Sequence, residues 1–401
     1  MFKYLRLFFS ETIKSKHSLN LILPSAKIIL NEYSLCDFCT GRLFAKKMKT
    51  SSIKILGKKI QKSLKIKPPK KCYICKNIFS NTPQILDLLL TKSSNYEFST
   101  FLIGTILKPS FIDRDDNIRS KFRLRGVDSI KTAITQQLSK QFAKKTKTKI
   151  KFLNPDITIT FNFKNESCEI YSKSLFYQGR YIKKIRGITQ KQTPCKNCNG
   201  RGCVGCNFHG ISEFTSVEGK IAKLLLEKIG GTQVKISWIG GEDKNSLVLG
   251  NGRPFFAKLL NPKKRRKRIP KKFSENGIDL INLKPVPSLP KTPVHFSSSI
   301  KLNVKTEFEL DETKLKKLKD LTSYPITVIE TPNKKNQKQI YSMNFKKSGP
   351  DSFILWIQVD GGLPIKRFVE GNGIVPNVSE ILENKCDCHE FDFQKIDLIQ
   401  V

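Results

Sequence analysis

Acidic side chains are scarce in this chain of 401 residues. Aspartate and glutamate total 34 against 73 lysines and arginines, which gives a formal net charge of +39. A field of this size attracts polyanions and repels other copies of the chain, so we expect a monomer with no obligate protein partner. Nucleic acid fits best as the partner, because every neutralised phosphate releases condensed counterions. A lysine-rich solvated surface is the alternative, but it does not explain the shortage of acids.

Long apolar runs are also missing. No continuous apolar segment is long enough to span a bilayer, and the first residues, MFKYLRLFFSETIK, lack the apolar stretch and cleavage site of a signal peptide. We therefore expect a soluble cytoplasmic protein that does not associate with membranes. With 38% apolar residues the chain has enough material for buried cores, and its length suggests two or three domains.

Cysteines are numerous, but their pattern does not suggest disulfides. Eight of the 11 cysteines form C-x-x-C pairs, and paired thiols in a chain without a secretory signal indicate metal ligands. Two such pairs supply the four thiolates of a tetrahedral zinc site and leave no open position for catalysis. We therefore expect one or two structural zinc ions, bound by Cys36, Cys39, Cys72 and Cys75 and by Cys195, Cys198, Cys203 and Cys206.

The two cysteine sets differ in the segment that joins their pairs. In the first set, a long Lys-rich segment with apolar residues at helical spacing separates the pairs, so we expect an inserted helix. The second set, CKNCNGRGCVGC (195–206), leaves no room for a core, and its glycines let the backbone fold around an ion. His209 offers a further nitrogen, but four thiolates already complete the tetrahedron, so we interpret it as a surface loop residue.

Hydrophobic periodicity predicts a mixture of helices and strands. Apolar residues recur at helical spacing in VDSIKTAITQQLSKQF (127–142) and in SVEGKIAKLLLEKIG (216–230). Alternating apolar residues over 157–163 predict a strand, and CEIYSKSLF (168–176) is its expected hairpin partner. The remainder of the chain alternates strands with one helix, so the predicted fold class is α+β.

The segment WIGGEDKNSLVLGNGRPFFAKLLNPKKR (238–265) carries the most informative motif. Two predicted strands flank a Gly-Gly turn with adjacent acids, Glu242 and Asp243, and a glycine-rich bend follows. On the residues alone, an acidic surface turn is explained by solubility. The segment nevertheless resembles the Pus-ten family of archaeal and eukaryotic tRNA pseudouridine synthases, which carries a G-R-E-D turn, then L-G-x-G-R-P-F and N-P. The matching positions are Gly240, Glu242, Asp243, Leu249, Gly250, Gly252, Arg253, Pro254, Phe255, Asn261 and Pro262.

The resemblance extends over nearly the whole chain. LCDFCTGRLFA and CYIC resemble the family's zinc half-sites, FLIGTILKP and SIKTAI its THUMP-containing accessory domain, and GGLPIKRFVEGNGIVPNVSEIL a motif near its C-terminus. The resemblance implies an N-terminal zinc-binding region over 1–80, a THUMP-containing RNA-binding domain over 81–178, and a catalytic domain over 179–401. The catalytic domain is expected to have the mixed or antiparallel sheet of pseudouridine synthases and to carry the four-cysteine zinc knuckle at 195–206.

The resemblance also implies the activity and the partner. The family isomerises uridines 54 and 55 in the T-loop of tRNA, and its catalytic aspartate falls on Asp243. A carboxylate can act as nucleophile or as base at the sugar, and both roles stay open for this residue. The reaction involves no net oxidation, so no organic cofactor is expected. The uridine must leave its stack before it can react, which costs on the order of a few kcal/mol.

Several positions depart from the family pattern. The arginine that precedes Glu-Asp is Gly241 here, and we assign Arg253 as its replacement beside the catalytic carboxylate. An active-site tyrosine falls on Phe296, which we expect to stack on the base, and an expected leucine falls on Ile381, an apolar wall of the pocket. Lys366 is assigned to backbone phosphates. The alternatives are ordinary core packing for the two apolar residues and a solvated strand end for the lysine.

Two other functions fit part of the pattern. A non-catalytic zinc-ribbon RNA-binding protein shares the cysteines and the charge, but for it Asp243 is dispensable. Another THUMP-type tRNA-modifying enzyme, such as a thiolase or a methyltransferase, needs a nucleotide or methyl-donor site. The chain has neither G-x-x-x-x-G-K-[ST] nor a glycine-rich strand-to-helix signature for a methyl donor.

Overall fold

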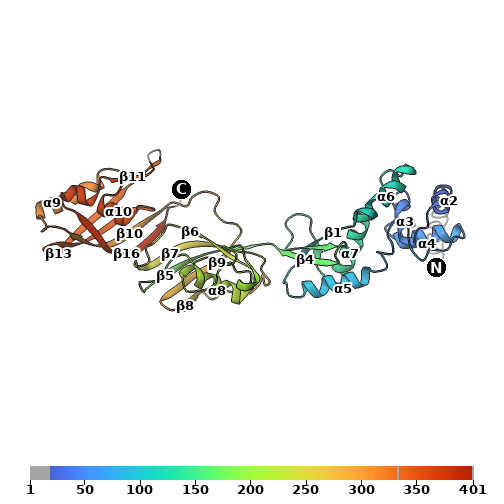
Figure 1. The fold of residues 1–401 in the computed structure, drawn as a ribbon, viewed down its shortest axis with the longest axis horizontal. Helices are drawn as coiled ribbons and strands as arrows, with labels where there is room; N and C mark the ends of the chain where they lie inside the picture. The colour runs from blue at the N-terminus through green and yellow to red at the C-terminus, as the bar shows by residue number, and fades with distance from the viewer. Residues whose placement is uncertain (1–18, 332–333, 400–401) are drawn as a thin grey trace, which may run out of the picture. The chain divides into compact units, whose positions relative to one another are not determined.

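A computed structural model describes residues 19–331 and 334–399 of the chain (Figure 1). The amino-terminal segment MFKYLRLFFSETIK lies outside these residues. The chain divides into two compact units, which we call the N-terminal unit (Met1–Lys173) and the C-terminal unit (Ser174–Val401). Each unit has its own hydrophobic core.

The predicted domain limits and these compact units do not coincide. The sequence placed a boundary between residues 178 and 179, inside strand β5 (Leu175–Lys183), which lies wholly in the C-terminal unit. It also separated residues 1–80 from 81–178, but the cysteine-bearing segment shares one core with the helices and strands that follow it. The structure thus describes two compact units, and the division at residue 80 stays a prediction.

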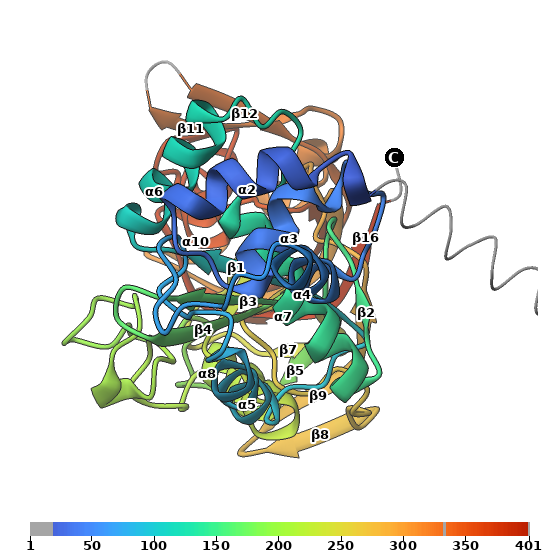
Figure 2. The same ribbon diagram turned by 90° about the vertical axis from the view of Figure 1, so that its right-hand side faces the viewer.

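The N-terminal unit packs helices on a four-stranded sheet. Its strand order is β2-β1-β3-β4, with β1 parallel to both neighbours and β4 antiparallel to β3. Helix α7 packs against β1, and α5 packs against α7 and β4, so both helices lie on one face of the sheet (Figure 2). The elements are α2 (Leu23–Glu32), α3 (Asp37–Ala45), α4 (Ile53–Ser63), α5 (Thr82–Ser93), β1 (Thr100–Ile106), α6 (Pro109–Lys121), α7 (Ile130–Thr146), β2 (Lys149–Ile150), β3 (Ile157–Asn162) and β4 (Ser167–Ser172).

Helix α7 confirms the helix that periodicity predicts over 127–142. Ser129 caps it, because its hydroxyl accepts a hydrogen bond from the backbone N–H of Thr132 at 3.1 Å. Its buried residues, among them Ile134 and Leu138, recur at helical spacing and form one apolar face. The predicted strand near 157–163 is likewise confirmed as β3, whose side chains alternate between buried and half-buried positions.

A buried ion pair connects three helices of the N-terminal unit. Arg42 on α3 pairs with Asp115 on α6, and both side chains are 1% exposed. Asp115 also accepts a hydrogen bond from the backbone N–H of Ile130 at 2.9 Å, at the start of α7, where the helix dipole favours a negative charge. Arg42 also donates to the carbonyl of Asp128 at 2.6 Å. The pair thus ties α3, which begins directly after Cys36, to the helix that covers the sheet.

The C-terminal unit is built on a nine-stranded mixed sheet. Its order is β13-β14-β10-β16-β7-β5-β9-β8, with β6 also paired to β7. Every neighbouring pair is antiparallel except β16 and β7, which are parallel. The predicted α+β class with a mixed or antiparallel sheet is therefore confirmed. The strands are β5 (Leu175–Lys183), β6 (Val234–Trp238), β7 (Val248–Leu259), β8 (Lys272–Glu275), β9 (Ile278–Val286), β10 (Phe296–Thr306), β13 (Ile340–Gly349), β14 (Ser352–Asp360) and β16 (Cys386–Leu398).

Helices and a small second sheet complete the C-terminal unit. Helix α8 confirms the helix predicted over 216–230, and it ends at Gly230, whose φ of +75° suits glycine. The buried face of α8 packs against β6 and β9. Over the described ranges, no helix is both long and apolar enough to cross a bilayer. The other elements are α8 (Val217–Ile229), α9 (Glu312–Lys317), α10 (Ile365–Glu370), α11 (Val378–Leu382), and the sheet of β11 (Ile326–Thr331), β12 (Lys334–Lys338) and β15 (Ile374–Val375).

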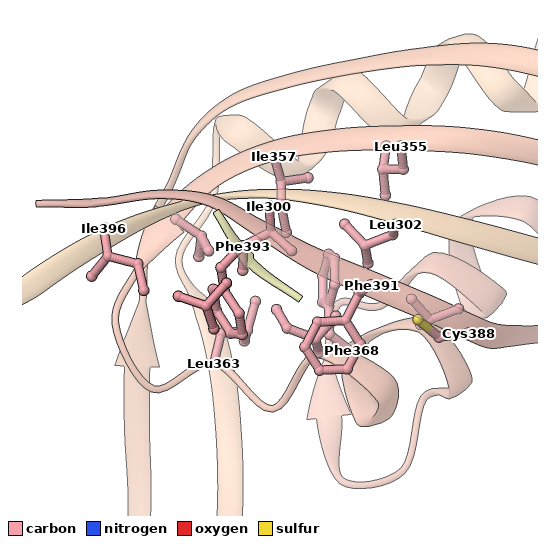
Figure 3. Packing of buried hydrophobic residues seen from close by; sticks show 14 of the residues in the cluster. Ile300, Leu302, Leu355, Ile357, Leu363, Phe368, Cys388, Phe391, Phe393 and Ile396 are labelled. Atoms are coloured by element: carbon pink, nitrogen blue, oxygen red, sulfur yellow. The ribbon is translucent and has the colours of Figure 1, made fainter. Parts of the chain in front are cut away.

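The core of this unit reaches the strand ends beside α10. Apolar side chains of β10, β14 and β16 pack together there and against α10 and the chain that leads into it (Figure 3). This packing holds α10 next to β16. The labelled residues of the cluster are Ile300, Leu302, Leu355, Ile357, Leu363, Phe368, Cys388, Phe391, Phe393 and Ile396.

Candidate functional site

A cavity of about 360 Å³ opens at the edge of this core in the C-terminal unit. Five stretches of chain form it: the turn between β6 and β7, Arg253 on β7, the start of β10, the segment from β14 into α10, and β16. Its lining includes both apolar and charged side chains. The lining residues are Gly240, Gly241, Glu242, Asp243, Arg253, Phe296, Ser298, Ile300, Val359, Asp360, Gly362, Leu363, Pro364, Ile365, Lys366, Arg367, Phe391 and Phe393.

The turn between β6 and β7 approaches Phe296 closely. A Cβ on Gly240 would lie 2.6 Å from the Phe296 ring and 2.7 Å from Nη1 of Arg253, and the φ of Gly240 is +74°. On the other side, a Cβ on Gly361 would lie 2.4 Å from the same ring. Only glycine fits at these two positions. Gly241 differs, because a Cβ there would meet nothing within 4 Å.

Asp243 lies on the cavity wall as a partly exposed carboxylate. Its Oδ2 is 3.2 Å from Nζ of Lys366, and its side chain is 31% exposed. Its Oδ1 accepts a hydrogen bond from the backbone N–H of Asn245 at 2.9 Å. Partial burial raises the pKa of Asp243, but the Asn245 N–H and Lys366 outweigh it, so the pKa is lowered overall. The carboxylate is therefore ionised at neutral pH.

Glu242 points away from solvent into a buried network. Its Oε2 accepts a hydrogen bond from the Tyr181 hydroxyl at 2.7 Å, and its Oε1 lies 3.0 Å from Nζ of Lys183. Nε of Arg253 is 3.6 Å from the same carboxylate. The side chains of Glu242 and Lys183 are both 0% exposed. A carboxylate without these partners would be costly to bury, so the network explains why an acid can occupy this position.

Lys183 also ties the turn to strand β5. Its ammonium group donates hydrogen bonds to the backbone carbonyls of Ile188 at 3.0 Å, Asp243 at 3.1 Å and Lys244 at 3.3 Å. The Ser246 hydroxyl donates to the Asp243 carbonyl as well, at 2.9 Å. The backbone that carries the Asp243 carboxylate is thus held by a buried cation.

Tyr181 and Lys183 were not identified from the sequence. Every second residue of β5 from Tyr177 onward is buried, so these two side chains share the inward face of the strand. A lysine at an inward position of an alternating strand is unusual, because a buried lysine needs a partner. That signal could have drawn attention to Lys183, but it does not reveal which acid pairs with it.

Arg253 lies wholly buried behind the turn. Its guanidinium stacks on the Phe393 ring, 4.2 Å from the centroid, and Nη1 donates to the Ile239 carbonyl at 2.9 Å. In the described part of the chain, Nη2 has no hydrogen-bond partner. The sequence assigned Arg253 as the partner of Asp243. The structure instead places Arg253 against Glu242 and places Lys366 against Asp243.

The remaining predicted site residues fall in different places. Phe296 and Lys366 line the cavity, but Ile381 is not among its lining residues. Ile381 is half-buried on α11 and packs against the core. The apolar wall comes instead from residues that include Leu363 and Ile365, just before and at the start of α10. Motif matching could not show that none of the α11 residues lines the cavity.

The first cysteine set comes together in the N-terminal unit. The sulfur atoms of Cys36, Cys39, Cys72 and Cys75 all lie within 4.8 Å of one another, so they could hold a metal ion. Cys36 is the N-cap of α3, and its sulfur accepts a hydrogen bond from the Cys39 N–H at 3.5 Å. A helix N-terminus favours the thiolate that binds a metal. Helix α4 lies between the two pairs, as expected.

The second cysteine set forms a knuckle in the C-terminal unit. The sulfur atoms of its four cysteines also lie within 4.8 Å of one another and could hold a metal ion. The backbone N–H groups of Cys203 and Gly210 each donate to the Cys206 sulfur at 3.3 Å. These bonds lower the pKa of the Cys206 thiol to about 6 against the opposing effect of burial. Nδ1 of His209 is 2.9 Å from the Thr232 carbonyl and is engaged there.

Comparison with known proteins gives two family matches that together cover most of the chain. Residues 86–162 match the archaeal THUMP domain of Pus10, and residues 176–287 and 291–397 match the Pus10 C-terminal domain. The tRNA pseudouridine synthase Pus10 of Nitrosopumilus maritimus is 49% identical over 377 residues, which cover 94% of this chain and 98% of that protein.

More distant relatives show the same relationship. The tRNA pseudouridine synthase Pus10 of Cenarchaeum symbiosum is 35% identical over 91% of this chain and 90% of that protein. The enzyme of the same description from Methanocaldococcus jannaschii is 29% identical over 92% of this chain and 93% of that protein. Among solved structures, a chain of a Cbf5-Nop10-Gar1 complex aligns over 54% of this chain and 58% of that chain, with 10% identity. Its TM-score of 0.29 is too low to transfer any detail of the site.

Proposed function

Because the chain belongs to the Pus10 family of tRNA pseudouridine synthases, which are isomerases, we propose that it converts uridines 54 and 55 of the tRNA T-loop to pseudouridine at the cavity around Asp243. The observation that carries the proposal is the carboxylate itself. Asp243 is held ionised beside Lys366, at the wall of a cavity of about 360 Å³ that also contains an aromatic ring. An extruded nucleotide needs an enclosure of this kind.

The reaction needs only groups that the chain supplies. The bond between C1′ of the ribose and N1 of uracil breaks, the base turns, and C5 bonds to C1′ while the C5 proton is transferred to nitrogen. No electrons are gained or lost, so neither an oxidant nor ATP is required. Asp243 acts at the sugar, as nucleophile or as base, and its low pKa keeps it in the charged form that both roles need.

The walls of the cavity suit a flipped uridine. Phe296 offers a ring on which the base can stack. Gly240 and Gly361 lie close to this ring, so it has little freedom to move. The unpartnered Nη2 of Arg253 is a donor for a uracil carbonyl oxygen, which would satisfy this buried group. Leu363 and Ile365 supply the apolar side that Ile381 was expected to supply.

Basic residues at the cavity suit the phosphates that flank the target nucleotide. Arg367 lines the cavity, although its guanidinium is also bonded to the Asn372 carbonyl at 2.8 Å and the Ile329 carbonyl at 2.9 Å. Lys366 is 44% exposed while paired with Asp243, so it can contact both the carboxylate and a phosphate. The net charge of +39 adds long-range attraction for tRNA.

We assign both cysteine sets to structural zinc. Four sulfur donors within 4.8 Å of one another match the closed tetrahedral sites that zinc prefers, and both sets lie outside the catalytic cavity. Zinc at these positions would hold loops together and would take no part in the isomerisation. In this proposal Asp243 supplies the carboxylate that acts at the sugar.

The decisive experiment replaces one carboxylate. Asp243→Asn keeps the shape and removes the charge, so pseudouridine formation on a T-arm transcript should fall below detection, while tRNA binding stays near wild type. Asp387→Asn is the matched control, because Asp387 is an exposed carboxylate on β16 of the same unit. Carbodiimide labelling of the RNA after incubation without added cofactor measures the product. Equal turnover by Asp243→Asn and Asp387→Asn would reject the assignment of Asp243, whereas tRNA binding without any product from the wild-type chain would favour a non-catalytic RNA-binding role.

A further inference from the structure

The knuckle formed by the second cysteine set carries a basic surface without acids. Between residues 195 and 212 there is no aspartate or glutamate, whereas Lys196 and Arg201 are both exposed; an exposed acid, Glu213, follows this segment. The cavity around Asp243 does not include any of these residues. The knuckle is therefore a separate surface with strong complementarity to a polyanion.

Two apolar side chains of the same segment are exposed as well. Val204 is 78% exposed and Phe208 is 51% exposed, so neither contributes its full area to a core. Phe208 also has a φ of +62°, and its neighbour Asn207 has a φ of +49°. Left-handed backbone at a residue other than glycine is disfavoured, and such strain clusters at functional sites. The chain thus accepts strain at the position where it exposes an aromatic ring.

The knuckle also exposes amide side chains. Asn197, Asn199 and Asn207 are exposed, and each offers both hydrogen-bond donors and an acceptor. An aromatic ring, cations and amides on one compact metal-binding loop are the groups that recognise an unpaired nucleotide: a base stacks on the ring, phosphates meet the cations, and base edges meet the amides. Duplex RNA would not expose a base to the ring.

The knuckle is anchored to the element that carries the catalytic turn. Nε2 of Gln233 donates to the Gly200 carbonyl at 3.0 Å, and His209 contacts the Thr232 carbonyl. Thr232 and Gln233 directly precede β6, and the turn with Asp243 follows its other end. A strand of five residues is roughly 16 Å long. The knuckle therefore sits at the opposite end of β6 from the turn, too far away to touch the nucleotide that reacts.

We propose that the four-cysteine knuckle is a second RNA contact site, at which an unpaired base of the substrate stacks on Phe208 while Lys196 and Arg201 hold the flanking phosphates. The inference rests on the proposed function for the identity of the RNA, a tRNA. The contacted nucleotide lies outside the cavity, elsewhere on the same tRNA molecule. The site contributes to binding and to the placement of the substrate, and takes no part in the reaction at the sugar.

The test compares two exposed phenylalanines of the same unit. Phe208→Ala should raise Kd and KM for tRNA roughly 5- to 100-fold, the effect of losing one stacked base, and leave kcat unchanged. Phe308→Ala is the control, because Phe308 is 68% exposed but lies between Glu307 and Glu309, where RNA is repelled. Phe208→Tyr keeps a stacking ring and should restore binding. Elemental analysis should find the zinc content of all three variants unchanged.

The cations give an independent readout. Lys196→Gln and Arg201→Gln should each reduce the slope of log Kd against log salt by about 0.7 to 0.9, the value of one lost phosphate contact. Ultraviolet crosslinking of wild-type protein to tRNA, followed by mass spectrometry, should place a nucleotide on the peptide that contains Phe208. This measurement needs no variant, so a knuckle that misfolds in a variant cannot obscure it.

The outcomes separate this proposal from the proposed function. If Phe208→Ala binds tRNA as tightly as Phe308→Ala, and no crosslink falls on the knuckle while others form elsewhere, the knuckle site is refuted. If wild-type protein binds tRNA through Phe208 but forms no pseudouridine, the knuckle site is supported and the proposed reaction is refuted. Loss of kcat without a change in Kd or KM would assign Phe208 to the active site and would also refute the knuckle site.

Discussion

Replacement of Lys183 by methionine tests the buried network under the catalytic turn. The change leaves Glu242 buried without its main cation, although the Tyr181 hydroxyl at 2.7 Å and Arg253 at 3.6 Å remain. Removing one member of a buried pair costs about 3 to 5 kcal/mol. The carbonyls of Asp243 and Lys244 also lose a donor. We therefore expect a loss of about 4 kcal/mol in the free energy of unfolding of the C-terminal unit.

This loss is large enough to measure by calorimetry. For a domain of roughly 200 residues, each kcal/mol shifts Tm by about 2 to 4 °C, so the transition of the C-terminal unit should fall by about 8 to 16 °C. Lys184→Met is the matched control, because Lys184 is 52% exposed and its partner Asp279, which is only 6% exposed, keeps a second cation, Lys272, at 3.7 Å. Because both lysines are solvated and Asp279 keeps one of them, the loss should be at most about 1 kcal/mol.

A triple variant separates charge from packing. Lys183→Met combined with Glu242→Leu and Arg253→Met removes all three buried charges, so it should be more stable by about 2 kcal/mol or more than Lys183→Met with Glu242→Leu alone, which leaves Arg253 as an unpaired buried cation. Lys183→Met protein that remains folded should show a lower kcat, because the turn that positions Asp243 has lost the hydrogen bonds from Lys183. If Lys183→Met melts within about 1 °C of Lys184→Met, the reasoning on the buried pair is refuted.

Three further predictions concern the Asp243–Lys366 ion pair, the Arg253 guanidinium and the two proposed zinc sites. Burial raises the pKa of Asp243, but the Asn245 N–H and Lys366 lower it overall, so Lys366→Gln should move the acid limb of the pH–rate profile to higher pH. The lowered pKa also means that the stability contributed by Asp243 is present above its unfolded pKa. That stability is lost as the pH falls through the lower folded pKa. An unchanged acid limb would argue against this pairing. Arg253→Lys keeps a cation near Glu242 but removes the planar guanidinium, so kcat/KM should fall about 10-fold at unchanged tRNA affinity. Steady-state kinetics and a tRNA-binding assay measure the two quantities, and an unchanged kcat/KM or a weakened affinity would contradict this role. Cys72→Ser and Cys206→Ser should each lower the zinc content by one ion per chain in elemental analysis. If neither variant loses zinc, the two cysteine sets are not zinc sites.

Local patterns in the sequence determined much of this protein. Helices α7 and α8 follow from apolar residues at helical spacing and from serine caps, because both depend on near neighbours only. The cysteine sets could be listed from their spacing, since a C-x-x-C turn already places two sulfur atoms together. The position of Asp243 in a glycine turn between two strands was also visible from the residues and from the motif they match.

Tertiary structure alone decided which charges meet. Lys366 reaches Asp243 because α10 packs beside β16, and Lys183 reaches Glu242 because β5 pairs with β7. Neither pairing leaves a local pattern, since the partners are far apart in the chain. The same limit applies to Ile381, which was expected in the pocket but is not one of its lining residues, and to Arg253, which was expected beside Asp243 but lies 3.6 Å from Glu242. A charge acquires its partner only when burial removes water from around it, and burial is a property of the assembled sheet.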